Sequence, residues 1–337
     1  MANLSIKYLG LDLKNPIIVG ASNLVTDLDT LKGLEDAGVA AIVYKSLFEE
    51  QIQLENIQMS EDLDEYKDRN AEMTSLFPNI EHAGPAEYLL NLRNAKESVK
   101  VPVFGSLNAV FDVSWVDYAK LIEETGVDGI ELNFYATPKD FNKEDSDIIN
   151  EQIEIIKEIK KNISIPVNVK LSPFYTNILK VVKMMDEAGA NGFVLFNRLF
   201  QPDIDIEKEK HHFPYNLSNV EDNRLSLRFA GMLHGNIKAT LCCGGGIFEG
   251  EDVIKMLLAG ADSVQIVSTI YKNKTQHIIK IIKDIENWMN EKNYSSIEDF
   301  KGKLSKKNTK DPFTYKRAQY VDILMKSEEI FKKYPMI

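Results

Sequence analysis

The fold class that the sequence predicts is α/β, in the form of one closed (β/α)8 barrel. The first observation is a series of short β-rich runs that are apolar almost throughout, as suits parallel strands buried on both faces. The second is that segments with helical spacing separate these runs. The runs occupy residues 16–22, 40–46, 101–108, 129–136, 166–173, 192–198, 239–245 and 263–269. Eight β–α units in succession indicate a TIM barrel.

The helical segments carry their own end signals. Val116–Thr125 and Val253–Ala259 show apolar residues at helical spacing between consecutive runs. Several helices are expected to end at a small-residue stop, with Gly38, Gly189 and Gly260 just before the next strand. Glycine at this position supplies the left-handed cap that reverses the chain.

Two connections are much longer than a usual βα loop, and both leave the C-terminal face of the predicted barrel. They cover 47–85 after the second strand and 199–222 after the sixth. Because active sites of such barrels are built from these loops, both are interpreted as lid or interface elements, with surface decoration or disorder as the alternative.

One barrel is expected over residues 1–300, followed by a C-terminal segment at 301–337. That segment begins with the polar run KGKLSKKNTKDP and continues into an amphipathic helical tail at 313–333. The tail is expected to pack on its own barrel or on a partner subunit.

Composition narrows the class of partner. A formal net charge of −11 and a pI near 5.1 argue against nucleic acid or an anionic membrane, since both select for clustered Lys and Arg. The N-terminus lacks a signal-peptide pattern and no apolar stretch approaches the ~20 residues of a membrane span. A cytoplasmic protein is therefore expected. The adjacent Cys242 and Cys243 should be reduced thiols, and no metal is assigned, because the five histidines form no ligand pattern.

Polar residues recur where the predicted strands end. Barrel strands point these positions into the mouth, so side chains from different strands should converge there. The positions are Ser22, Lys45, Ser46, Asn108, Asn133, Lys170, Ser172, Asn197, Gly244, Gly245, Gly246 and Ser268.

The glycine run after the seventh strand indicates a phosphate site. Gly244, Gly245 and Gly246 let backbone N–H groups approach phosphate oxygens, and the following helix N-terminus adds a favourable dipole. Ser268 and Thr269 after the eighth strand complete the pattern typical of barrel phosphate sites. An acidic protein can therefore hold a phosphate locally.

In their order along the chain, these motifs resemble the dihydroorotate dehydrogenase family over about residues 4–300. The resemblance rests on Asn15-Pro16, Gly20-Ala21-Ser22, Lys45-Ser46, Glu131-Leu132-Asn133, Val169-Lys170-Leu171, Asn197, Gly245-Gly246-Ile247 and Gly260–Gln265. It implies an FMN-dependent oxidoreductase of pyrimidine biosynthesis that acts on CH–CH groups, with hydride passing from dihydroorotate or a related small substrate to the flavin.

The resemblance also implies residue roles. Ala21, Ser22 and Ser46 would lie beside the flavin, and Lys170 near its pyrimidine edge, where a cation stabilises the anionic reduced form. The phosphate and the remaining contacts fall to Asn108, Gly244, Gly245, Gly246, Ser268 and Thr269. Lys45, Asn133 and Asn197 would face both flavin and substrate. Arg198, which the resemblance does not account for, is a separate candidate for contact with an anionic group of the substrate.

The catalytic base is where this sequence departs from the family pattern. The family continues Glu-Leu-Asn into Ser-Cys-Pro-Asn or a serine equivalent, whose Cys or Ser removes a proton. Here the continuation is Phe134 to Pro138, which puts Ala136 at the base position. A one-residue shift offers the Thr137 hydroxyl instead, and Tyr135 is a second candidate. The expected catalytic set is thus Lys45, Asn133, Thr137 and Lys170.

Other departures fall mostly on the substrate side. The loop after the second strand offers only Asn70 and Asn79 for the family's substrate-binding turn, and Arg198 replaces a serine. Glycines are absent from Asn219–Arg228, and Val267 replaces a phosphate-loop glycine. These changes bear more on dihydroorotate as substrate than on FMN.

Two alternatives remain open beside the flavin oxidoreductase. One is a flavin-free phosphate-binding barrel, a lyase or isomerase with Lys170 as nucleophile; the other is a non-catalytic flavin-binding homologue. The sequence shows no nicotinamide fingerprint and no Cys cluster for an iron–sulfur centre, so electron transfer by such groups would need a separate acceptor subunit. The long mouth loops and the tail, with Phe313, Tyr315, Tyr320 and Leu324, predict a homodimer.

Overall fold

The computed structural model describes residues 2–53, 85–109, 112–134, 141–198, 202–212, 217–311, 314–316 and 318–335. Eight parallel strands close into a barrel, which confirms the predicted (β/α)8 fold. Around the barrel they follow the order β11-β12-β3-β4-β5-β6-β7-β8. Their bounds are β3 (Ile17–Val19), β4 (Ala41–Phe48), β5 (Val103–Asn108), β6 (Gly129–Asn133), β7 (Val167–Leu171), β8 (Gly192–Leu195), β11 (Thr240–Gly244) and β12 (Ser263–Ile266).

The strands are held in place by short polar contacts at their N-terminal ends. Asn15 accepts the N–H of Ile17 with its Oδ1 at 2.9 Å and donates from Nδ2 to the carbonyl of Gly38 at 2.7 Å. This side chain therefore ties the start of β3 to the turn that precedes β4.

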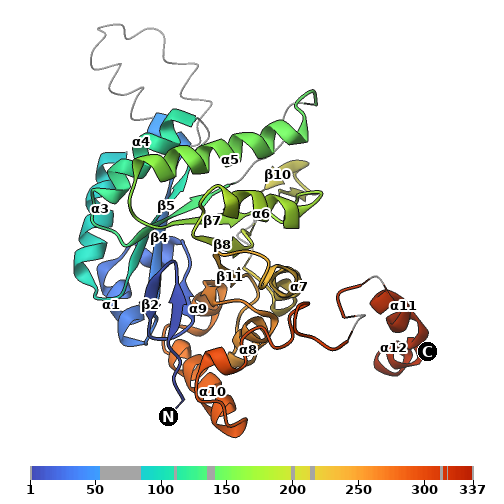
Figure 1. Cartoon of the computed structure of the whole chain (residues 1–337). Coiled ribbons are helices and arrows are strands. Elements are labelled where there is room, and N and C mark those ends of the chain that lie inside the picture. The colour runs from blue at the N-terminus through green and yellow to red at the C-terminus, as the bar shows by residue number, and fades with distance from the viewer. Residues whose placement is uncertain are drawn as a thin grey trace, which may run out of the picture.

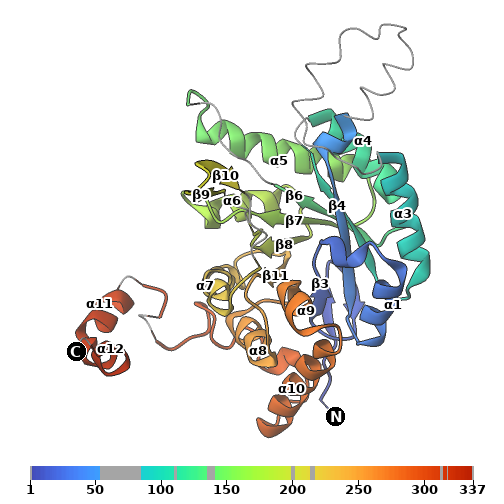
Figure 2. The same cartoon turned by 180° about the vertical axis from the view of Figure 1, so that it is seen from behind.

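Helices surround the barrel, as Figures 1 and 2 show from opposite sides. They are α1 (Leu28–Asp36), α3 (Pro85–Ser98), α4 (Asp112–Glu123), α5 (Asp145–Asn162), α6 (Ile178–Glu187), α7 (Asn223–Leu233), α8 (Gly250–Ala259), α9 (Ser268–Asn273) and α10 (His277–Glu291), with the 3-10 turns η1 (Asn23–Val25), η2 (Val220–Asp222) and η3 (Ile297–Asp299). The predicted stops at Gly38, Gly189 and Gly260 have φ of 98°, 105° and 120°, as left-handed caps require.

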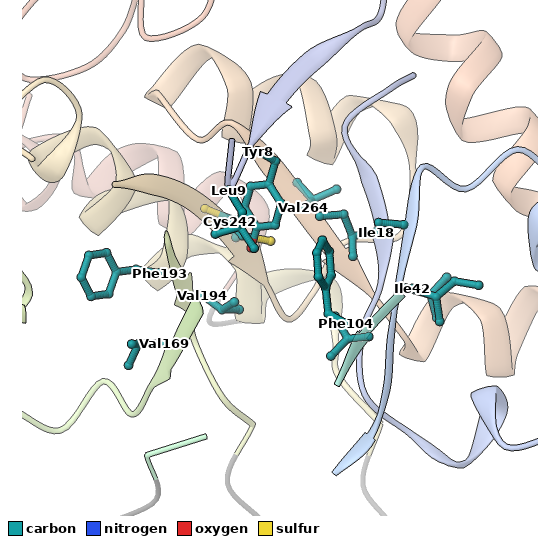
Figure 3. Packing of buried hydrophobic residues seen from close by; sticks show 14 of the residues in the cluster. Tyr8, Leu9, Ile18, Ile42, Phe104, Val169, Phe193, Val194, Cys242 and Val264 are labelled. Carbon is teal, nitrogen blue, oxygen red and sulfur yellow. The ribbon is translucent and has the colours of Figure 1, made fainter. Parts of the chain in front are cut away.

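A hairpin that the sequence analysis missed closes the N-terminal end of the barrel. It pairs β1 (Ile6–Tyr8) with β2 (Leu11–Leu13). Tyr8 is fully buried, and its ring contacts that of Phe104 edge-on with centroids 6.2 Å apart. Figure 3 shows Tyr8 beside Cys242 and Phe104 within the apolar interior. The open mouth therefore lies at the other, C-terminal end.

The structure describes the two long connections to different extents. After β4, residues 54–84 lie outside the described part of the chain. After β8, the connection contains a small antiparallel hairpin of β9 (Asp203–Asp205) and β10 (Lys210–His212), followed by η2.

The segment after α10 first packs along the barrel and then leaves it. Backbone N–H groups of Gly302 and Leu304 donate to the carbonyls of Leu257 and Leu258 at 2.8 and 2.9 Å. Beyond it, α11 (Ala318–Met325) and α12 (Ser327–Lys333) stand apart from the barrel in Figures 1 and 2. Among the described residues, no helix is long and apolar enough to cross a membrane.

Candidate active site

A cavity of about 310 Å³ opens at the C-terminal ends of the strands. It lies within the size range of small-molecule and cofactor sites. Predicted site residues from several strands line it, namely Ala21, Ser22, Lys45, Ser46, Lys170, Asn197, Arg198, Gly244, Gly245, Gly246 and Ser268. The convergence expected from the strand-end pattern is therefore present.

Three predicted residues are placed differently. Asn133 is 9% exposed and reaches the site through Asn197, whose Nδ2 donates to its Oδ1 at 3.0 Å. Asn108 does not line this cavity. Thr269 is buried beneath it, where its hydroxyl donates to the carbonyl of Phe248 at 3.2 Å and accepts from Asn273. Thr137 and its alternatives lie outside the described residues.

One end of the cavity has the backbone form of an anion site. Gly245 has φ +79°, and a Cβ built on it would meet no atom of the described residues within 4 Å, so its outer side is open there. Gly246 has φ +69°, but a Cβ there would lie 2.7 Å from the carbonyl oxygen of Asn219. Gly245 therefore leaves room for a ligand, whereas Gly246 is needed for close backbone packing.

The segment 217–222 lies against this end through Ser218. The Ser218 N–H donates to Ser268 Oγ at 2.9 Å, and Lys272 Nζ donates to the Ser218 carbonyl at 3.0 Å. Arg198 adds a hydrogen bond to Ser218 Oγ at 3.3 Å and an ion pair with Asp222 at 2.7 Å. Arg198 thus holds its own loop, which is a contact that the sequence analysis did not predict for it.

The β3 and β4 side of the cavity presents Ser22, Lys45 and Ser46. Ser22 Oγ is buried and has no hydrogen-bond partner among the described residues. Ser46 Oγ shares a hydrogen bond with Ser106 Oγ at 2.7 Å, so its hydroxyl is already engaged. A buried hydroxyl without a partner is costly, and Ser22 is therefore suited to a ligand atom.

The floor of the cavity holds a polar cluster of Lys170, Glu131 and Gln265. A role was predicted for Lys170, whereas Glu131 and Gln265 were motif residues without a predicted role. Lys170 Nζ contacts Glu131 Oε1 at 3.4 Å and Gln265 Oε1 at 3.1 Å. The alternation of side chains along a strand could have placed Glu131 in the site, because it precedes Asn133 by two residues and so shares its face of β6. Gln265 could only be joined to them once the strands were placed around the barrel.

The comparisons with known proteins agree with this geometry. A family model described as dihydroorotate dehydrogenase matches residues 3–289. The chain belongs to the dihydroorotate dehydrogenase family. It is 29% identical to dihydroorotate dehydrogenase B (NAD(+)), catalytic subunit, of Thermoplasma acidophilum, covering 90% of this chain and 99% of that protein. It is 24% identical to dihydroorotate dehydrogenase A (fumarate) of Lactobacillus helveticus, covering 83% and 92%.

Membership in the dihydroorotate dehydrogenase family confirms the predicted oxidoreductase class, whose members act on CH–CH groups and are generally flavin enzymes. It supports this interpretation over a flavin-free lyase or isomerase. The family model ends at residue 289, so α11 and α12 lie beyond it.

Neither cysteine is suited to act as a base or nucleophile in this dihydroorotate dehydrogenase homologue. Cys242 and Cys243 are free thiols with no exposed surface, as expected from their sequence. Burial raises the pKa of Cys242 to about 12 and also raises the pKa of Cys243. A family proton acceptor must therefore come from another residue.

Proposed function

We propose that the chain binds one non-covalent FMN across the barrel mouth and oxidises dihydroorotate or a related small cyclic or carboxylated substrate. The observation that carries the proposal is a single cavity lined both by the open, left-handed Gly245 and by Lys170. Gly245 suits a phosphate and Lys170 suits an electron-rich ring edge. The Ser22 hydroxyl, which has no hydrogen-bond partner among the described residues, lines the same cavity and gives a further donor.

The proposed roles follow from the chemistry of each residue. Backbone N–H groups at Gly245 and Gly246, with Ser268, would hold the phosphate, and Ala21, Ser22 and Ser46 would border the ring. FMN, when bound, supplies the hydride acceptor. Lys170 would stabilise negative charge that develops at the ring edge.

On the substrate side, the donor–acceptor pair of Asn133 and Asn197 suits a cyclic imide. Lys45 makes no hydrogen bond within the described part of the chain and lines the cavity, so it would be available to flavin and substrate. The Arg198 guanidinium already pairs with Asp222, so an anionic substrate group would bind it alongside that carboxylate. The proton acceptor would be Thr137 or a water that it orders.

A spectrum of the purified protein tests the cofactor. We expect yellow protein with one FMN per chain, released on denaturation as free FMN. Colourless protein that does not take up added FMN would refute this part of the proposal. Anaerobic mixing with dihydroorotate then tests the substrate, and bleaching of the flavin should be slow but complete.

Failure of every dihydropyrimidine to bleach the bound flavin would reject the substrate and leave the FMN site standing. Lys45→Ala, Asn133→Ala and Lys170→Ala should each slow bleaching in the same assay.

A homodimer and a separate electron-acceptor subunit are the proposed partners. The relative from Thermoplasma acidophilum is itself named a catalytic subunit, which supports a separate electron-acceptor subunit.

The homodimer is supported by the tail, where Tyr320, Val321 and Leu324 are more than half exposed. Residues 301–337 carry ten Lys and Arg against four Asp and Glu, a net +6, which leaves −17 on residues 1–300. A basic apolar tail and an acidic barrel are complementary between two copies.

Light scattering of the full chain should give the mass of a dimer, and Leu324→Glu should give a monomer. Leu90→Glu is the matched control, because Leu90 is the same residue type and is exposed to a similar extent, 55% against 54%, but lies on α3, outside the tail and the long mouth loops. A monomeric wild-type protein would contradict the dimer.

A further inference from the structure

Three side chains from three strands form a closed ring of hydrogen bonds under the cavity. Lys170 of β7 donates from Nζ to Glu131 Oε1 of β6 at 3.4 Å and to Gln265 Oε1 of β12 at 3.1 Å. Gln265 Nε2 closes the ring by donating to Glu131 Oε2 at 2.6 Å. Each amide atom of Gln265 therefore has one partner, which fixes its orientation.

Glu131 is the acceptor on which this cluster depends. Its side chain is 1% exposed, and it receives a further hydrogen bond from Asn168 Nδ2 at 3.1 Å. Its oxygens thus accept from an ammonium and two amide groups. An amide in place of this carboxylate would turn its own N–H group toward one of these donors, so the position calls for an acceptor-only group.

Lys170 connects this buried cluster to the cavity. Its side chain is 13% exposed and lines the cavity, whereas Glu131 does not. A lysine side chain has several rotatable bonds and loses up to ~2 kcal/mol of conformational free energy when it is fixed. The hydrogen bonds to Glu131 and Gln265 offset that loss, because they already fix the ammonium before any ligand binds.

We propose that Glu131, together with Gln265, is a positioning residue that holds the Lys170 ammonium at the edge of the cavity where it meets the flavin. This inference rests on the proposed FMN site. Glu131 would affect the flavin only indirectly, by fixing the position of the Lys170 ammonium. The rival interpretation is that the carboxylate only compensates the lysine charge.

The two interpretations predict opposite shifts of the midpoint potential of the bound flavin. If Glu131 positions the ammonium, Glu131→Gln lets the cation leave the ring edge, and reduced flavin loses stabilisation. We expect a tenfold loss in the preference for reduced over oxidised flavin, equal to about −30 mV for a two-electron couple. If the carboxylate only compensates charge, its removal leaves a more positive site and the potential rises.

The experiment is a double-mutant cycle between Glu131→Gln and Lys170→Met, read by spectroelectrochemistry and by the FMN dissociation constant of the apoprotein. Lys170→Met alone should shift the potential further negative. In that background no cation is left to position, so Glu131→Gln should no longer lower the potential or weaken FMN binding, and loss of the buried negative charge should instead raise the potential. Thermal unfolding of each apoprotein controls for folding.

An exchange variant, Glu131→Gln with Gln265→Glu, sharpens the test. It returns one carboxylate and one amide to the ring in swapped positions, so Lys170 regains a charged acceptor. FMN affinity and potential should recover toward wild type. Should Glu131→Gln not fold, Glu131→Asp, which is one methylene shorter, replaces it in the cycle.

A positive shift in Glu131→Gln, or a shift of equal size with and without Lys170, would overturn the proposal. So would wild-type values of both potential and affinity in Glu131→Gln. A wild-type protein that binds no FMN would instead refute the proposed function, and the two failures are therefore distinguishable.

Discussion

At the proposed phosphate end of the cavity, the chain turns tightly out of β11 and β12, whereas at the proposed substrate end it leaves β4, β6 and β8 through longer connections. Gly244–Gly246 and Ser268 all lie in the described part of the chain. The Gly244 and Gly246 carbonyls accept from the Ser226 and Asn223 side chains, and Ser268 Oγ accepts from the Ser218 N–H. The connections at the other end include 54–84, 135–140 and 199–201, which lie outside it.

The same contrast holds for the sequence motifs. The phosphate end keeps the glycine pair of the family and differs at Val267, while the substrate end changes the base motif itself at Tyr135–Pro138. Strand ends are fixed by the barrel, but long connections can change without disturbing it. Cofactor chemistry is therefore easier to infer for this chain than substrate chemistry.

The largest expected effect lies at the substrate end. Thr137→Val should slow flavin bleaching by ~10²–10⁴-fold, the range typical of a lost acid–base group. Stopped-flow mixing under anaerobic conditions measures it, with Tyr135→Phe as the companion variant. Unchanged bleaching in Thr137→Val, together with slow bleaching in Tyr135→Phe, would move the proton acceptor to Tyr135.

Gly245→Val tests the phosphate end. A side chain there enters the open space beside the backbone N–H groups, and each lost hydrogen bond to an anion is worth about 1.5–3 kcal/mol, so FMN affinity should fall about a hundredfold or more. Fluorescence titration of the apoprotein measures this change.

Gly126→Val controls for backbone strain, because Gly126 also has a left-handed φ, +85°, and open space around it, but does not line the cavity. Both variants should lose thermal stability, and only Gly245→Val should lose FMN. Normal FMN affinity in a folded Gly245→Val protein would show that the phosphate lies elsewhere.

Ser22→Ala should have a smaller effect on FMN binding than Gly245→Val. The Ser22 hydroxyl is buried and has no partner in the described part of the chain. A ligand hydrogen bond is worth about 0.5–1.5 kcal/mol, so FMN should bind roughly 2–10-fold more weakly. Apoprotein stability should stay the same or rise, because an unsatisfied polar group is removed. Tighter FMN binding in Ser22→Ala would contradict this role.

The smallest change is expected at Arg198. Its ion pair with Asp222 is partly exposed, so Arg198→Ala and Asp222→Asn should each weaken FMN binding by only about fivefold or less. If Arg198 also contacts an anionic substrate, KM should rise in Arg198→Ala and not in Asp222→Asn. An equal rise in both would restrict Arg198 to holding its loop.

The barrel and its strand-end residues could be predicted because apolar runs and strand direction determine where side chains such as Lys45 and Lys170 emerge. The β1–β2 hairpin was missed because each strand is only three residues long and carries little periodic signal. The tail was expected as one amphipathic run, but it divides at Lys326 into α11 and α12.

Within the site, hydrogen-bond partners were harder to predict than positions. Glu131 and Gln265 are 134 residues apart in the chain, and their 2.6 Å contact exists only because β6 and β12 face each other across a closed barrel. Arg198 likewise meets Asp222 through a loop whose path no local pattern specifies. Spacing indicates which residues share a face, whereas pairing depends on the tertiary fold.

The burial of both native thiols makes the chain a convenient carrier for site-specific probes. Cys242 and Cys243 are the only cysteines, and both lie in β11 with no exposed surface. A cysteine introduced at an exposed position would therefore be the one thiol that reacts with a maleimide in the folded protein. Spin labels or fluorophores placed in this way on α11 and on the β9–β10 hairpin would report distances within and between copies without prior removal of native cysteines.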